Sequence, residues 1–151
     1  MAKLTLPDGG ILEIADGTTA RQLAEQIGSG LAKSAVAAKV NEQLVDLSTP
    51  ISDDAVVQII TLADTQGLAI MRHSCAHIMA EAICSIWPDT KLVYGPAVED
   101  GFYYDIDLDE SICPGDFPRI EEKMREIIKS DKPFIRMQMS RAEALAKLVG
   151  D

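Results

Sequence analysis

The stretch "KLTLPDGGILEIA", Lys3–Ala15, places two short apolar segments on either side of the turn residues PDGG. Glycine supplies the positive φ that a tight turn needs, so the stretch predicts a β-hairpin. The next segment, "GTTARQLAEQIGSG", predicts a helix, because Thr18 or Thr19 can cap its N-terminus and Gly28 can end it. The chain therefore opens with two strands and one helix.

Three further strands complete the first domain, residues 1–63. The segment "SAVAAKVNEQLVDL" predicts a strand, a turn at Asn41-Glu42 and a second strand. The β-branched run "AVVQIITL", Ala55–Leu62, predicts a buried central strand. One helix on a mixed sheet is an α+β architecture, and the order β-β-α-β-β-β is that of a ubiquitin-like β-grasp domain.

The polar segment "ADTQG", Ala63–Gly67, marks a domain boundary, and residues 68–151 predict a second α+β unit. A helix is expected over Leu68–Ile86, ending before Pro88. The segments "KLVYGPAV" and "GFYYDIDL" predict two strands, and "DFPRIEEKMREIIKSD" predicts a helix with Asp116 at its N-cap. A further strand is expected over Lys132–Met139, and the capping box of "SRAE" begins a last helix.

Composition narrows the class of protein. The net charge of −10 disfavours non-specific binding to nucleic acid, which needs Lys and Arg on phosphates, so no DNA partner is expected. The longest apolar runs are far shorter than the roughly 20 residues that span a bilayer, and the N-terminus carries no apolar signal segment. The three cysteines are odd in number and irregularly spaced, which argues against a disulfide framework and indicates reduced thiols. We expect a cytoplasmic protein with no membrane partner.

The segment "RHSCAH", Arg72–His77, is the first candidate site. Each helical residue advances 100°, which places His73 and His77 one turn apart and opposite the apolar arc that holds Cys75. Ala80 shares the face of the histidines on this wheel. Imidazoles at i and i+4 can converge on one polar substrate group or one metal ion, and they can equally belong to a solvated face. The spacing leaves both readings open.

The same segment does not match the usual zinc motifs. A catalytic zinc takes three protein ligands, and this helix offers two histidines. The metalloprotease motif has Glu directly after its first His, where this chain has Ser74. Any further ligand must come from elsewhere in the fold, so the segment is half of a site.

The segment "GPAVEDGFYYDIDL" is the second candidate. Its consecutive aromatics cannot all face one way on a strand, so burial of Tyr103 would put Phe102 and Tyr104 together on the other face. The segment fits a packed hairpin, and it also fits a pocket wall in which a phenol binds a ligand. The alternating acidic residues from Asp105 to Glu110 predict a solvated strand edge.

These segments together resemble bacterial threonyl-tRNA synthetase. The segments "TLPDG", "IGSGLAKSAVAAKVNEQLVD" and "IITL" are similar to the ubiquitin-like TGS domain that begins this family. The segments "RHSCAHIMAEAI" and "GPAVEDGFYYDIDL" are similar to the first part of its editing domain. The resemblance assigns residues 1–63 to the TGS domain and residues 68–151 to the editing domain, and it covers the whole chain.

The resemblance implies a function. The family attaches threonine to tRNA(Thr) with ATP, and its editing domain hydrolyses seryl-tRNA(Thr). Editing is needed because a pocket rejects a missing methyl group by only about 1–3 kcal/mol. By this resemblance His73 and His77 are catalytic residues that face the aminoacyl end of the tRNA, where they position the ester and a water or transfer a proton, and Tyr104 binds substrate.

The resemblance also sets limits. The family's later C-x-x-x-H pair is absent from this sequence, which has no histidine after His77. We therefore expect an N-terminal fragment with half an editing site, no ligase activity and little or no deacylase activity. ATP, magnesium and zinc belong to the family's catalytic domain, so this chain is expected to bind no cofactor, and a homodimer is expected only for the full-length enzyme.

Two other functions compete with this one. The chain could be a standalone TGS-type regulatory or RNA-binding module without catalysis, although its charge of −10 suits RNA poorly. It could also be a metal-dependent hydrolase with zinc on His73 and His77, and with Cys113 as a candidate third ligand.

Overall fold

The N-terminal hairpin forms one side of a five-stranded mixed sheet. The computed structural model describes residues 1–132, 135 and 137–147. Strands β1 (Ala2–Thr5) and β2 (Ile11–Ile14) pair antiparallel, and Gly9 in the turn has φ +82°. Buried Ala2 and Leu4 alternate with exposed neighbours on β1, so one face of the hairpin is directed to the core. The predicted hairpin is confirmed.

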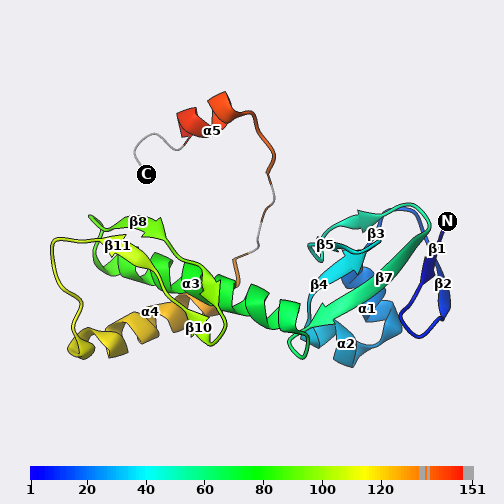
Figure 1. Ribbon diagram of the computed structural model, residues 1–151, viewed down its shortest axis with the longest axis horizontal. Coiled ribbons are helices and arrows are strands. Elements are labelled where there is room, and N and C mark those ends of the chain that lie inside the picture. Colours follow the sequence, from blue (N-terminus) through cyan, green and yellow to red (C-terminus); the bar gives the residue numbers. More distant parts are fainter. Residues whose placement is uncertain (133–134, 136, 148–151) are drawn as a thin grey trace. The chain divides into compact units, whose positions relative to one another are not determined.

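The sheet continues through β7, β4 and β5. Its strand order is β2-β1-β7-β4-β5, with β7 (Ala55–Thr61) in the centre, β4 (Ala35–Val40) beside it and β5 (Gln43–Val45) at the edge (Figure 1). Strand β7 runs parallel to β1 and antiparallel to β4. Asn41 and Glu42, with φ +47° and +66°, make the turn between β4 and β5. The predicted central strand and this turn are confirmed.

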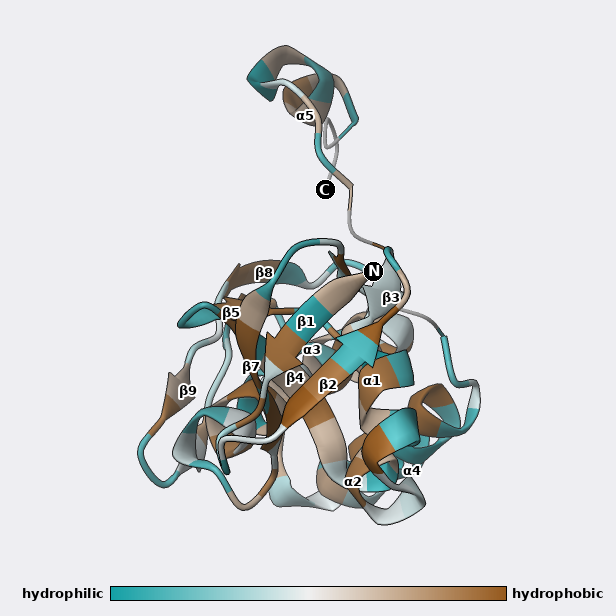
Figure 2. Cartoon of the chain, turned by 90° about the vertical axis from the view of Figure 1, so that its right-hand side faces the viewer, coloured by the Kyte–Doolittle hydropathy of each residue, from teal (hydrophilic) through white to brown (hydrophobic). Residues whose placement is uncertain are grey.

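Helix α1 (Ala20–Ile27) buries its apolar face against the sheet. Thr19 caps it in a capping box with Gln22, and Gly28 ends it. The core contains these buried residues: Ala2, Leu4, Ile14, Ala20, Leu23, Ala38, Leu47, Ile51 and Val57. In Figure 2 hydrophobic and hydrophilic segments alternate along β1, as a strand with one covered face requires. This arrangement confirms the α+β class and the β-grasp order.

The first unit also contains short elements that the sequence did not predict. Helix α2 (Ser29–Ser34) follows α1 directly, and β3 (Thr18–Thr19) pairs with β6 (Pro50–Ile51). Two-residue strands and a one-and-a-half-turn helix carry too few residues to show a period, which explains why they were missed.

The second unit is built from a long helix, a hairpin and a second helix. Its elements are α3 (Thr65–Ile86), β8 (Lys91–Tyr94), β9 (Ala97–Val98), β10 (Gly101–Phe102), β11 (Asp105–Asp107), the 3-10 turn η1 (Pro114–Asp116), α4 (Phe117–Lys129) and α5 (Arg141–Lys147). Strand β8 pairs with β11, and β9 with β10. Ala82 and Ile83 of α3 pack with Ile120 of α4 to form a small core.

Helix α3 begins three residues earlier than predicted, at Thr65. The Asp64 carboxylate accepts from the backbone N–H and the hydroxyl of Thr61, and the Asp64 carbonyl accepts from Leu68 N–H, so the polar segment starts the helix. Contacts divide the chain into two compact units after Arg72, within α3, whereas the sequence placed the boundary at 63–67. The assignment of residues 1–63 and 68–151 as domains stays a prediction.

Two further expectations are met only in part or not at all. Asp116 is the N-cap residue of α4, as predicted, but its side chain makes no cap hydrogen bond, because its carboxylate accepts from Cys113 N–H and closes the 3-10 turn. The strand expected over Lys132–Met139 is not formed by its described residues, and residues 133, 134 and 136 lie outside the described part, as do residues 148–151 of the second domain. The capping box that begins the last helix is confirmed by the bonds between Ser140 and Glu143.

Candidate functional site

His73 and His77 lie one turn apart on α3 and contact each other directly. Their Nε2 atoms are 3.0 Å apart, and their ring centroids are 4.5 Å apart with the planes at 85°. A hydrogen bond between two ring nitrogens holds one hydrogen, so one imidazole donates while the other accepts. Both side chains are exposed, as the helical wheel predicted. The pair is therefore a joined donor–acceptor unit open to a ligand.

The apolar arc of the wheel also holds Met71, Ala82 and Ile83; Ala82 and Ile83 are buried as predicted, but the wheel was less accurate for two other residues of α3. Ala80, placed on the face of the histidines, is only 2% exposed, while Met71, placed on the apolar arc, is 37% exposed. A wheel assigns an angle and takes no account of side-chain length, so a short alanine can lie beneath its neighbours while the longer imidazoles reach past them. Cys75, predicted to be buried, is half-buried.

The hairpin of the second unit brings Tyr104 to the histidines. The Tyr104 ring lies 6.5 Å from the His77 ring, measured between centroids, at an interplanar angle of 66°. Tyr103 is 45% exposed, so the arrangement that would follow from its burial does not apply. Tyr103 and Tyr104 follow the last residue of β10, and the half-buried member of the two faces the imidazoles.

A hollow of about 380 Å³ opens at this point. It is lined by His73, His77, Val93, Tyr94, Gly95, Pro96, Ala97 and Tyr104. The structure thus brings together all three residues that the sequence singled out. Sequence reasoning missed the wall from Val93 to Ala97, because its role depends on how the hairpin is folded. The sequence signal that could have revealed this wall is the glycine–proline pair, which separates two short strand-like runs.

The polar groups of the hollow suit the binding of a small polar substrate. Two imidazoles and the phenols of Tyr94 and Tyr104 can donate and accept hydrogen bonds, while aliphatic side chains and the proline ring cover part of the wall. Ligand sites commonly combine an apolar wall with a few convergent polar groups of this kind. Such groups can orient an ester and a water molecule, and an imidazole can transfer a proton between them.

The cysteines do not join the histidines. Burial raises the pKa of the Cys84 thiol, which favours the protonated, unreactive form. Cys113 stands at the start of η1, where its N–H donates to Asp116 and its thiol contacts the Ser111 carbonyl. Within the described ranges no three His, Cys, Asp or Glu side chains converge as a metal site would require. The proposed zinc set of His73, His77 and Cys113 is therefore not assembled.

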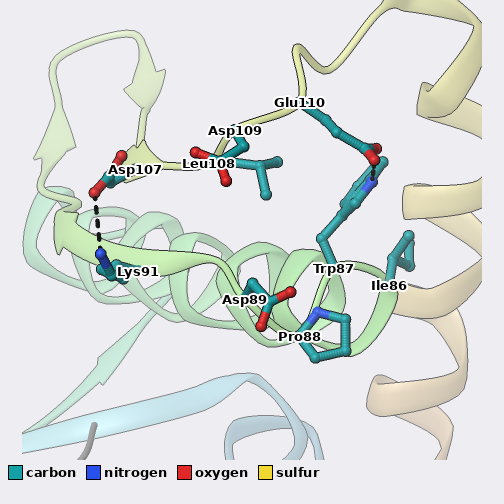
Figure 3. Close-up of a pocket in the computed structure, with 9 residues that line it drawn as sticks. All are labelled: Ile86, Trp87, Pro88, Asp89, Lys91, Asp107, Leu108, Asp109 and Glu110. Atoms are coloured by element: carbon teal, nitrogen blue, oxygen red, sulfur yellow. Dashed lines mark hydrogen bonds and ion pairs between the residues drawn. The ribbon is translucent and has the colours of Figure 1, made fainter.

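A second, larger hollow of about 500 Å³ lies at the far end of α3 (Figure 3). The Trp87 indole N–H donates to Glu110 at 3.1 Å, and Lys91 pairs with Asp107 at 3.6 Å. The acidic residues of this strand edge are exposed, as predicted, but two of them bind partners within the fold. We therefore assign these groups to the structure of the unit.

Comparison with known proteins identifies the first unit. Residues 2–61 match the TGS domain family. Over its whole length the chain is 46% identical to threonine–tRNA ligase 1 of Bacillus subtilis, of which it covers 24%. It is 52% identical, over 96% of its length, to threonine–tRNA ligase of Desulfatibacillum aliphaticivorans, of which it covers 23%.

The chain therefore spans about a quarter of the length of the curated relatives it matches. In the described part of the chain no helix has the length and apolar character needed to cross a membrane. The resemblance seen in the sequence is confirmed: this chain carries an N-terminal TGS domain and matches an N-terminal fragment of threonyl-tRNA synthetase.

Proposed function

We propose that this chain acts as the N-terminal part of a cytoplasmic threonine–tRNA ligase and holds half of its site for hydrolysing seryl-tRNA(Thr). The observation that carries the proposal is the meeting of His73, His77 and Tyr104 around one hollow, the three residues that the resemblance implicated. The same residues dispersed over the surface would have supported a binding module at most.

In this proposal the imidazole pair positions the ester carbonyl and a water molecule at the aminoacyl end of the tRNA. The hydrogen-bonded pair can take a proton from the water and return one to the leaving ribose oxygen. The Tyr104 phenol, beside His77, orients the substrate. The remaining groups come from the part of the editing domain that follows these residues in the relatives, so the isolated chain is expected to lack deacylase activity.

We assign the family's other activities to parts of the full-length enzyme that this chain does not include. We place ATP, magnesium and zinc in the catalytic part of the full-length enzyme, and we expect dimerisation and tight binding of tRNA(Thr) only there. A standalone TGS-type RNA-binding module would need a basic surface, which a net charge of −10 does not favour. A gel shift with tRNA at low salt that shows tight binding by the isolated chain would favour that module.

A chimeric enzyme tests the proposal. Residues 1–147 replace the matching segment of Bacillus subtilis threonine–tRNA ligase 1, and hydrolysis of seryl-tRNA(Thr) is measured beside threonylation. We expect His73→Ala and His77→Ala each to slow hydrolysis by about 100-fold or more, the usual contribution of a general acid–base group. Threonylation should be unchanged, which controls for folding. Hydrolysis at the parent rate in both variants would contradict the proposal.

A further inference from the structure

The hairpin behind the hollow keeps one register from the Tyr94–Asp105 pair to its turn, although its hydrogen-bonded ladder is interrupted there, and the register shifts only beyond Asp105. Tyr94 of β8 lies opposite Asp105 of β11, and Ala97 of β9 lies opposite Phe102 of β10. Counting inward from either pair places Gly95 opposite Tyr104. Pro96 has no N–H to donate, which accounts for the interruption between the two ladders. Gly95 and Tyr104 are therefore a directly facing cross-strand pair.

There is no room for a side chain at Gly95. A Cβ atom built there would lie 2.2 Å from Cδ2, 2.4 Å from Cε2 and 2.7 Å from Cγ of Tyr104, so the ring lies directly on the glycine backbone. The backbone itself does not require glycine, because the positive-φ glycines among the described residues are Gly9 and Gly17. Gly95 also precedes a proline, which favours the extended conformation that any residue can adopt. The requirement at this position is space for one aromatic ring.

We propose that Gly95 is a positioning residue: its bare backbone seats the Tyr104 ring and thereby holds the phenol beside the histidine pair. Carbon atoms rest about 3.5–4.0 Å apart, so a methyl group at position 95 must displace the ring by roughly 1 Å or more. The ring would move within the wall that it shares with His73 and His77. The importance of this positioning for substrate rests on the proposed function, whereas the positioning itself is a property of the fold.

Histidine-selective isotope labelling tests the inference in the 151-residue chain, because its two histidines are both in the hollow. Imidazole NMR signals are compared in the parent, Gly95→Ala and Tyr104→Ala. We expect Gly95→Ala to shift the His77 signals in the direction of the Tyr104→Ala spectrum, since both changes take the aromatic ring away. The matched control is Gly101→Ala in the same hairpin, where an added Cβ meets no atom within 4 Å and the signals should stay in place.

The double variant separates positioning from a general effect on folding. With Tyr104→Ala already present, the added methyl group has no ring to displace, so Gly95→Ala should cause no further shift. If Gly95→Ala alone fails to fold, the double variant should fold again. Parent-like His77 signals in Gly95→Ala, an equal further shift in the double variant, or a double variant that also fails to fold would each overturn the inference. None of these measurements depends on deacylation. The positioning of the ring can therefore be tested even if the proposed function is wrong.

Discussion

Gly67, in the first turn of α3, shows how a single residue can decide whether an element can form. A Cβ atom there would lie 1.9 Å from the Thr61 carbonyl oxygen and 3.2 Å from Val36 Cγ2. The obstacle is backbone, which cannot rotate away as a flexible side chain can. This close approach allows the helix to begin directly after β7.

Gly67→Ala is expected to destabilise the first unit by about 1–3 kcal/mol, the usual cost of forcing an atom into packed structure. Chemical denaturation followed by circular dichroism measures the change. Gly30→Ala is the matched control, because Gly30 also lies in a helix and a Cβ there meets no atom within 4 Å. Alanine should stabilise that position by about 0.5–1 kcal/mol. Equal effects of the two substitutions would contradict the steric explanation.

For single residues, the sequence predicted which side chains are exposed better than it predicted which side chains contact each other. Helical periodicity placed His73 and His77 on an open face, because 100° per residue is a local rule. Their contact with Tyr104, and the seat of that ring on Gly95, depend on a hairpin register that no local rule supplies. Tyr103 and Tyr104 are alike in sequence, and the fold decides which one faces the imidazoles.

At the scale of elements, the chain contains the same capping box twice in different surroundings. Thr19 and Gln22 exchange bonds of 2.9 and 3.3 Å at the start of α1, and Ser140 and Glu143 exchange bonds of 2.8 and 3.3 Å at the start of α5. Helix α1 packs into the core, whereas α5 has no buried residue. Comparing the loss of each cap therefore distinguishes an effect on the local helix from an effect on the stability of the whole fold.

Thr19→Ala should lower the free energy of unfolding of the first unit by about 1 kcal/mol, the typical cost of losing an N-cap side chain. Ser140→Ala removes an equivalent cap and should leave that unfolding transition unchanged, because no core depends on α5. Urea denaturation of the two variants measures both effects. A similar loss of stability in both variants would show that α5 packs against the fold in solution.

The junction between β7 and α3 is expected to weaken in acid. The backbone N–H of Thr61 and then its hydroxyl lower the pKa of the Asp64 carboxyl, because both stabilise its charged form. A carboxyl whose pKa is lower in the folded state stabilises the fold above its unfolded pKa of about 3.9, and this contribution is lost as the pH falls through the folded value.

Asp64→Asn keeps an oxygen acceptor for Thr61 but cannot be protonated in this range. Its unfolding free energy should therefore fall less than that of the parent between pH 6 and pH 3, as measured by urea denaturation at each pH. Thr61→Val removes the hydroxyl and keeps the backbone N–H, so it should give an intermediate slope. Parallel pH profiles for the parent and Asp64→Asn would contradict this account.

At the scale of the whole molecule, each compact unit contains a core of its own. All nine residues of the larger core lie in the first unit, and the three buried residues of the smaller core lie in the second. Periodicity and turn chemistry predicted the main elements of the first unit well, since β1, β2, β4, β7 and α1 are each long enough to show a pattern, whereas α2, β3 and β6 are not. The second unit was predicted less well, because its hairpin is interrupted by Pro96 and the Asp116 carboxylate bonds to Cys113 N–H and makes no cap bond to α4.

A fragment of residues 1–72 is expected to fold alone, because its core needs no contact from later residues. Amide hydrogen exchange should show protected β1, β4 and β7 amides in the fragment, as in the 151-residue chain. Exchange at the rate of an unfolded chain would show that the first unit depends on the second.

The contact between His73 Nε2 and His77 Nε2 has a further consequence, which concerns the direction of proton flow. With both rings neutral, the donating ring has an accepting Nδ1, and the accepting ring has a protonated Nδ1. Uptake of a proton at the first Nδ1, transfer across the 3.0 Å contact and release from the second Nδ1 would leave the pair with its polarity reversed. Under the proposed function, the pair could therefore pass a second proton in the same direction only after its two hydrogens had returned to their first positions.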